Sequence, residues 1–176
     1  MLVAGLGQVA ILKTGQLGRL AVPLDFGLYW RRKPVLGPSK TWRGVIIMTT
    51  LAALTARAQA AAARRSSRLR SICPFDYRRV NPWLLGSGLG LGYCIAELPN
   101  SFVKRRLGIP SADTSRRWPG LQYLIDQSDS VVGCLIALRL FYRPRWSEAG
   151  LALGSGVGVH VAVDQLMHVL GVKPRD

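Results

Sequence analysis

Apolar residues gather in long blocks along this chain, and polar, basic stretches separate the blocks. The blocks cover residues 1–12 (continuing weakly to residue 23), 45–63, 80–99, 131–142 and 149–172. A helix needs about 20 predominantly apolar residues to cross a bilayer, so the second, third and fifth blocks have a suitable length and the other two are short. In lipid a helix satisfies its own backbone hydrogen bonds. The pattern therefore predicts an all-α integral membrane protein with about five transmembrane helices, built as a single domain over residues 1–176.

Glycines recur at intervals of four inside these blocks. The repeats are Gly86 with Gly90, Gly88 with Gly92, and Gly150 with Gly154 and Gly158. Small residues at this spacing line one helix face and allow two backbones to approach closely. A glycine-rich phosphate loop is the weaker alternative, because the run lacks the Gly-Lys-Ser/Thr ending of a nucleotide-binding loop and lies inside an apolar block. We expect these glycines to pack helices together.

The net charge is +15 although 49% of the residues are hydrophobic. Nucleic-acid-binding proteins are often this basic but rarely contain long uncharged runs, so no nucleic-acid partner is expected. Multi-span membrane proteins combine both features, because basic loops face the cytoplasm and anionic lipid. The three cysteines show neither a disulfide framework nor zinc-ligand spacing. Composition therefore indicates membrane lipids as the chain's surroundings.

Basic loops predict the orientation of the spans. Positive residues precede the second block and follow the third, which places both loops in the cytoplasm if two spans separate them. We expect a protein integral to the cytoplasmic (inner) membrane, in which these two motif loops form a polar cleft and an active site that faces the cytoplasm. Residues 64–79 contain six arginines, and five simple spans would place them outside, so the side of this segment stays open.

The first motif loop covers residues 23–27 and 32–44, where prolines and glycines predict a tight, bent connection. Lys40 and Arg43 then stand close to the N-terminus of the next helix, where free backbone N–H groups already favour anions. Charge and amides together could hold a triphosphate. Alternatively, the loop merely anchors the helix, with Trp42 at the membrane interface.

The second motif begins before the end of the third block. Glu97, Asn100 and Ser101 are spaced three and four residues apart, so on a helix they share a face. Lys104 continues this face, and Asp126 and Asp129 are also one turn apart. Three carboxylates near a membrane surface could bind Mg²⁺, which prefers one or two carboxylates together with water and phosphate oxygens. In the alternative interpretation, the two aspartates cap a helix start and pair with nearby arginines.

The last block carries His160, Asp164 and His168 on one helix face. Ionisable residues inside a span are costly and usually functional. The spacing could be drawn as a metal site. Hydrogen bonding between helices, or the lining of a polar cavity, is the favoured interpretation.

Together these blocks resemble the CDP-archaeol synthase family, which is related to the bacterial CDP-diglyceride synthases. The resemblance covers most of the chain and rests on Pro-Leu-Asp-x-Gly, Leu-Gly-x-x-Lys-Thr-Trp-Arg-Gly, Ser-Phe-Val-Lys-Arg-Arg-Leu-Gly, Asp-Gln-x-Asp, and His160 with Asp164 before Leu-Gly-Val-Lys. Several features depart from the family pattern. Pro99-Asn100 stands where a small residue followed by Gly is expected, and the N-terminal apolar segment looks short. Glu97 stands where the family has Asp, and Asp164 stands where it has Asn.

The resemblance implies a CTP-dependent cytidylyltransferase that converts a phosphorylated lipid, either an ether lipid phosphate or one like phosphatidic acid, into a CDP-lipid and pyrophosphate. It implies Mg²⁺ as cofactor, held by Asp126, Asp129 and Glu97. The implied catalytic residues are Lys40, Arg43, Lys104, Asp126 and Asp129. The implied substrate-binding residues are Asp25, Thr41, Asn100, Ser101, Arg105 and Arg106. The alternative is a catalytically weak or inactive membrane protein whose basic loops bind anionic lipid.

Overall fold

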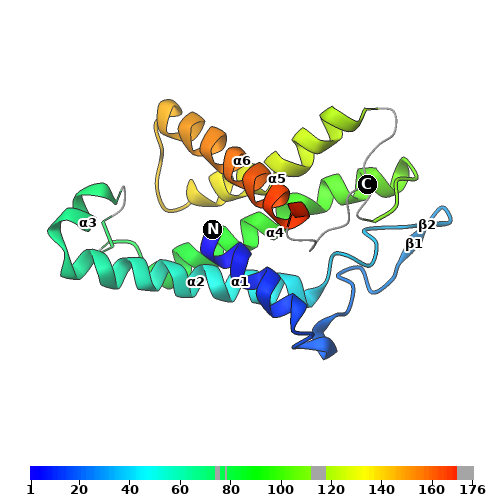
Figure 1. Ribbon diagram of the computed structural model, residues 1–176, viewed down its shortest axis with the longest axis horizontal. Coiled ribbons are helices and arrows are strands. Elements are labelled where there is room, and N and C mark those ends of the chain that lie inside the picture. The colour runs from blue at the N-terminus through cyan, green and yellow to red at the C-terminus, as the bar shows by residue number, and fades with distance from the viewer. Residues whose placement is uncertain (74–75, 78, 112–117, 170–176) are drawn as a thin grey trace.

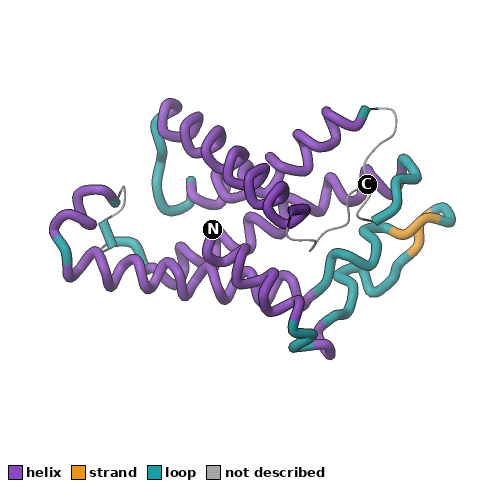
Figure 2. Tube along the Cα trace, viewed as in Figure 1, coloured by secondary structure: helices purple, strands orange, loops and turns teal. Residues whose placement is uncertain are grey.

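The structure, a computed structural model, describes residues 1–73, 76–77, 79–111 and 118–169, with the side chains of residues 72 and 166–169 left out. Helices make up most of this part of the chain (Figure 2). The long helices are α1 (Leu2–Lys13), α2 (Trp42–Arg65), α4 (Pro82–Arg106), α5 (Pro119–Leu138) and α6 (Trp146–Val169). The short elements are the 3-10 turn η1 (Gly18–Leu20), the helix α3 (Ser67–Ile72) and the antiparallel strands β1 (Tyr29–Trp30) and β2 (Lys33–Pro34). The expected all-helical class is confirmed.

Helix α4 is the central element of the bundle. It packs against α2 on one side and α5 on the other, while α1 contacts α2 and α6 contacts α5 (Figure 1). Local signals fix where these helices begin. The Thr41 hydroxyl caps α2 by accepting from Gly44 N at 3.3 Å, and the Asn81 side chain caps α4 by accepting from Trp83 N at 2.9 Å. Proline occupies the first turn of both α4 and α5, where its missing N–H costs nothing.

Small residues let α4 approach its neighbours closely. A methyl group on Gly86 would lie 2.5 Å from the Ala52 carbonyl oxygen of α2, and one on Gly92 would lie 2.6 Å from the Gly133 carbonyl oxygen of α5. The prediction of packing glycines is thus confirmed for α4. It is wrong for the repeat in α6, since methyl groups at Gly150, Gly154 and Gly158 would meet no described atom within 4 Å. That repeat lies on the open side of α6.

The expectation of about five membrane spans is met only in part. Among the described helices, α2 has the length and composition of a membrane-crossing segment, while α1 is apolar but short. Helices α4 and α5 carry buried polar residues, including Ser101, Gln122 and Gln127. These residues and the glycines lower the hydropathy of both helices, although neither helix is short.

Two helix boundaries differ from the sequence expectation. The third block was expected to end at Pro99, but α4 continues to Arg106, as membrane helices tolerate an internal proline when neighbours compensate. The fourth block was expected to begin at residue 131, but α5 begins at Pro119. Asp126 and Asp129 therefore lie within α5, and the alternative in which they cap a helix start is wrong. Hydropathy misses the first half of α5 because its polar residues face α4.

The two motif loops lie at the same end of the bundle, as expected. The hairpin β1–β2 and the C-terminus of α4 stand together at one end of Figure 1, whereas α3 and the arginine-rich segment around it lie at the other. Positive residues thus occur at both ends. Arg78, Arg116, Arg117 and the Leu-Gly-Val-Lys tail fall outside the described residues.

We expect Gly92→Ala to destabilise the α4–α5 contact. The added methyl group would also lie 2.7 Å from Ala137 Cβ, and overpacking of this kind costs about 1–3 kcal/mol. Gly154→Ala is the matched control, because its methyl group points into open space and alanine favours a helix over glycine by about 1 kcal/mol. Thermal unfolding in one detergent should show a lower melting temperature for Gly92→Ala alone. Equal effects of the two substitutions would contradict the close contact.

Candidate active site

The first motif loop meets α4 through an ion pair. Lys40, one residue before the N-cap of α2, pairs its ammonium group with the Glu97 carboxylate of α4. About a quarter of each side chain is exposed (25% and 23%), so the pair lies in a partly buried position that is open on one side. Residues far apart in the sequence are therefore joined where the loop enters the bundle.

Asn100 joins the two aspartates of α5 to α4. Its amide nitrogen donates to Asp126 Oδ1 at 2.6 Å and to Asp129 Oδ2 at 2.9 Å. The Gln122 amide donates to Asp126 Oδ1 at 2.9 Å and to the Asn100 side-chain oxygen at 3.1 Å. Lys104 pairs with the second oxygen of Asp126 at 3.0 Å. Each aspartate thus has a donor from the facing helix.

Ser130 connects these two groups of residues. Its hydroxyl donates to Glu97 Oε1 at 2.9 Å and lies 3.0 Å from Asp129 Oδ1, and its backbone N–H donates to the same Asp129 oxygen at 2.6 Å. The side chain is almost completely buried. One continuous polar network therefore runs from Lys40 through α4 and α5 to Lys104. We call it the α4–α5 polar network: Lys40, Glu97, Asn100, Lys104, Gln122, Asp126, Asp129 and Ser130.

Helix periodicity explains why the network forms. Glu97, Asn100 and Lys104 follow one another at three and four residues and project from one face of α4, as the sequence predicted. Gln122, Asp126 and Asp129 repeat the same spacing on α5. Unpaired charges between helices are costly, so when the two helices pack, their polar faces pair with each other and with Lys40 of the loop.

The α4–α5 polar network contains ligand atoms of the type that Mg²⁺ prefers, namely carboxylate oxygens. Asp126 and Asp129 provide two carboxylates, and this ion takes one or two together with water and phosphate oxygens. No described group of three histidine, cysteine, aspartate or glutamate side chains is arranged to hold a metal. Glu97, expected as a third ligand, is instead engaged by Lys40 and Ser130. Magnesium binding at these residues stays a prediction.

The three cations at the end of α4 point in different directions. Successive helix residues rotate by about 100°, so neighbours cannot converge on one group. Lys104 faces Asp126, whereas Arg105 donates to Ser111 Oγ at 2.7 Å and to the Pro110 carbonyl oxygen at 3.1 Å. Arg106 turns to the hairpin β1–β2. Lys104 is thus the member of this run that joins the α4–α5 polar network.

The remaining residues expected at the site lie in and around the first motif loop. The buried Asp25 carboxylate accepts from Gly27 N at 3.0 Å and from Leu36 N at 2.7 Å, so it shapes the loop. Thr41 caps α2, and Ser101 is buried inside the bundle. Arg43 lies in the first turn of α2, and no described residue accepts a hydrogen bond from its buried Nε. Substrate contacts at these positions stay predictions.

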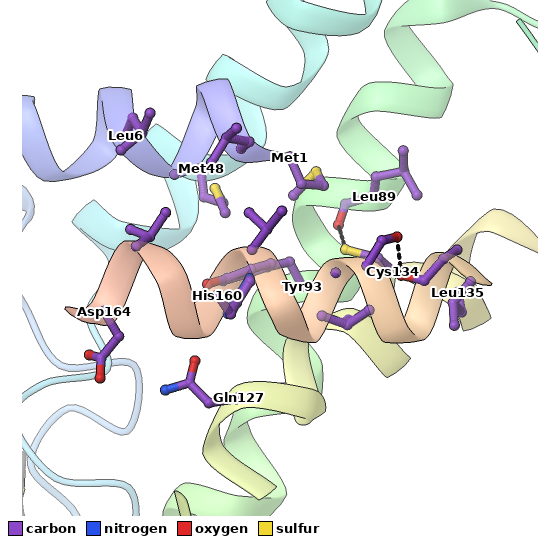
Figure 3. Close-up of a pocket in the computed structure, with 18 of the residues that line it drawn as sticks. Met1, Leu6, Met48, Leu89, Tyr93, Gln127, Cys134, Leu135, His160 and Asp164 are labelled. Carbon is purple, nitrogen blue, oxygen red and sulfur yellow. Dashed lines mark hydrogen bonds between the residues drawn. The ribbon is translucent and has the colours of Figure 1, made fainter. Parts of the chain in front are cut away.

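A cavity of about 530 Å³ lies beside the polar network, lined by residues of α1, α2, α4, α5 and α6. Most of its wall is apolar, with Met48, Leu89 and Val131 among the lining residues. Gln127 and Asp164 lie toward one end, and Leu89 and Leu135 lie toward the other (Figure 3). Gln127 stands next to Asp126 in the sequence, so the polar end of the cavity adjoins the α4–α5 polar network.

His160 and Asp164 of α6 were expected to form hydrogen bonds between helices or to line a cavity. His160 packs against Tyr93 with ring centroids 5.7 Å apart, and Tyr123 of α5 donates to Asp164 at 3.3 Å. Interhelical hydrogen bonding is thus confirmed for Asp164. Both His160 and Asp164 line the cavity, but the expectation of a polar cavity is met only in part, because most of the wall is apolar. The His168 side chain falls outside the described residues.

Sequence reasoning missed two members of the α4–α5 polar network. Gln122 precedes Asp126 by one helical turn, and an i, i+4 search from the aspartate would have found it once α5 was extended to Pro119. Ser130 gave no comparable signal, because a serine beside an aspartate is common. Its importance depends on the position of Glu97 on another helix.

Comparisons with known proteins agree with this geometry. The model of the CarS-like CDP-archaeol synthase family matches residues 13–173. A CDP-archaeol synthase of Methanospirillum hungatei is 31% identical over 127 residues, which cover 71% of this chain and 67% of that protein. One of Archaeoglobus fulgidus is 29% identical over 160 residues, covering 86% and 82%.

A solved structure of an intramembrane enzyme for archaeal membrane lipid biosynthesis is also similar. It gives a TM-score of 0.59 with 22% sequence identity, and the match covers 92% of this chain and 90% of that one. At this identity the similarity establishes a shared fold, and the fold is that of an enzyme embedded in a membrane.

Proposed function

Because the chain belongs to the CDP-archaeol synthase family, we propose that it is a membrane-embedded cytidylyltransferase that converts CTP and a phosphorylated lipid into a CDP-lipid and pyrophosphate. The observation that carries this proposal is the α4–α5 polar network. It brings a lysine from each motif region, Lys40 and Lys104, to the carboxylates of two helices beside an apolar cavity. We further propose that the network faces the cytoplasm, where CTP is available.

The reaction needs charge neutralisation more than a strong base. A lipid phosphomonoester has a second pKa of about 6 and is mostly dianionic at neutral pH. One of its oxygens forms a bond to the α-phosphorus of CTP, while the bond from that phosphorus to the bridging oxygen of the β-phosphate breaks and pyrophosphate leaves. Lys40 and Lys104 can place positive charge beside these anions, and the paired carboxylates hold both ammonium groups in position.

Mg²⁺ is the proposed cofactor, with Asp126 and Asp129 as its holders. When bound, it would neutralise phosphate charge on the nucleotide. Asn100 keeps the two carboxylates side by side, since its amide donates to both. Gln122 then fixes the orientation of that amide by donating to its oxygen.

We propose that the apolar cavity receives hydrocarbon chain from the lipid substrate. Its volume falls within the range of about 300–1,000 Å³ that is typical of ligand pockets, and its wall is largely apolar with polar groups toward one end. A lipid phosphate likewise has an apolar hydrocarbon part and a polar phosphate group at one end. With its chain between α1 and α6, the phosphate would lie toward Gln127 and the α4–α5 polar network.

We expect Asp126→Asn and Asp129→Asn each to lower kcat/KM by about 10²-fold or more, because each substitution removes charge that positions a lysine or a metal ion. Pyrophosphate release and transfer of CTP labelled at its α-phosphate would be measured with Mg²⁺ and a panel of ether-linked and ester-linked lipid phosphates. Glu148→Gln is the control, because this exposed carboxylate bonds with Tyr142 and Arg145 and lies outside the network. A wild type that binds anionic lipid but never releases pyrophosphate would support the binding alternative instead.

We expect Ala152→Phe to raise the KM for the lipid phosphate by about tenfold and to leave the KM for CTP unchanged. Ala152 lines the cavity, and the larger side chain would occupy space proposed for the hydrocarbon chain. Leu151→Phe is the matched control on the same helix, since Leu151 is 74% exposed and does not line the cavity. If both variants change the lipid KM equally, the cavity is not the chain's binding site.

A further inference from the structure

Arg106 holds the β1–β2 hairpin through the hairpin's main chain. Its guanidinium donates to the carbonyl oxygens of Trp30 at 2.6 Å, Lys33 at 3.0 Å and Pro34 at 2.5 Å. It also lies 5.2 Å from the ring centroids of both Trp30 and Phe102. Lys33 returns a bond by donating to the Arg106 carbonyl oxygen at 2.8 Å. The end of α4 and the hairpin thus bind each other reciprocally.

The hairpin belongs to a closed loop that ends at Lys40. At the base of the loop, Leu24 N donates to the Lys40 carbonyl oxygen at 2.8 Å and Trp42 N donates to that of Val22 at 3.0 Å. In its middle, Asp25 accepts from Leu36 N at 2.7 Å. Such cross-links make residues 22–42 one unit, so a shift of the hairpin is transmitted to Lys40.

Side chains attach this unit to α4 in two separated regions. One is the Lys40–Glu97 ion pair. The other comprises Arg106 and the Trp30–Phe102 ring stack, with centroids 5.8 Å apart, and Arg106 lies about 13.5 Å further along the helix at a rise of about 1.5 Å per residue. An ammonium group has three N–H donors, so Lys40 can face a polyphosphate while Glu97 holds it. The hydrogen bonds of Arg106 hold the same loop against α4 further along the helix.

We propose that Arg106 is a positioning residue that acts through the hairpin on Lys40 and does not contact the substrate. The proposal rests on the proposed cytidylyltransferase function. Arginine suits the role because its planar fork reaches several carbonyl oxygens at once and stacks on aromatic rings. The family resemblance, by contrast, implied that Arg106 binds the substrate.

The test is Arg106→Lys, which keeps the positive charge but loses the planar guanidinium group that contacts three carbonyl oxygens. We expect the KM and the dissociation constant for CTP to rise about tenfold while kcat stays within about twofold, because the substitution weakens binding of the ground state and the transition state alike. Arg32→Lys is the control, because Arg32 lies at the exposed turn of the same hairpin and should leave both constants unchanged. Lys33→Met removes the donor of the return bond without changing Arg106 and should shift both constants in the same direction.

A double-variant cycle separates positioning from direct contact. If Arg106 acts through Lys40, Arg106→Lys should weaken CTP binding little further, by less than about twofold, once Lys40→Gln is present. Independent, multiplicative losses would show that Arg106 touches the nucleotide and would overturn the proposal.

Hydrogen exchange of the substrate-free protein provides a readout that needs no turnover. Arg106→Lys should speed exchange at Val35, whose N–H bonds to Leu28 across the hairpin, and Arg32→Lys should not. Unchanged exchange would contradict the claim that Arg106 holds the hairpin in place, even if the enzyme is active. Absence of turnover by the wild type would instead refute the proposed function, so the two failures are distinguishable.

Discussion

The structure depends on the need to satisfy charged side chains between two packed helices. Glu97 on α4 and Asp126 and Asp129 on α5 are partly buried and take part in hydrogen bonds between the two helices. Burial of an unpaired carboxylate is costly, so each must find donors on the facing helix or on the loop. Lys40, Lys104, Asn100 and Ser130 supply them. This requirement fixes the register of α4 against α5 and the position of the first loop.

The same requirement gives the site its chemistry. Three carboxylates share two lysines, so the α4–α5 polar network keeps negative charge available for a cation while it holds ammonium groups ready for an anion. Close packing at Gly92 brings the two polar faces together, and the cavity between α1 and α6 begins beside them. Hydrophilic chemistry and an apolar compartment thus meet at one place, as a reaction between a nucleotide and a lipid requires.

Much of this could be predicted from the sequence, because helix spacing is a local property. The shared face of Glu97, Asn100 and Lys104, the entry of Lys40 near α2, and the meeting of the two motif loops were all foreseen. The start of α5 was not, since its polar half looks like a loop when its partner is unknown. Roles that depend on another element were also missed. Ser130 donates a hydrogen bond to Glu97 on another helix. Arg106 donates to carbonyl oxygens of a hairpin that the hydropathy pattern does not predict.

The most direct test of this account is the proximity of the first loop to α4 in the membrane. Lys40→Cys with Glu97→Cys, in a chain whose three native cysteines are replaced by serine, would be treated with a short thiol cross-linker and analysed by mass spectrometry. The account predicts a cross-link between positions 40 and 97, and none when Lys40→Cys is combined instead with Ser67→Cys at the start of α3. Cross-linking of 40 with 67, or none with 97, would contradict the convergence of the two motif regions.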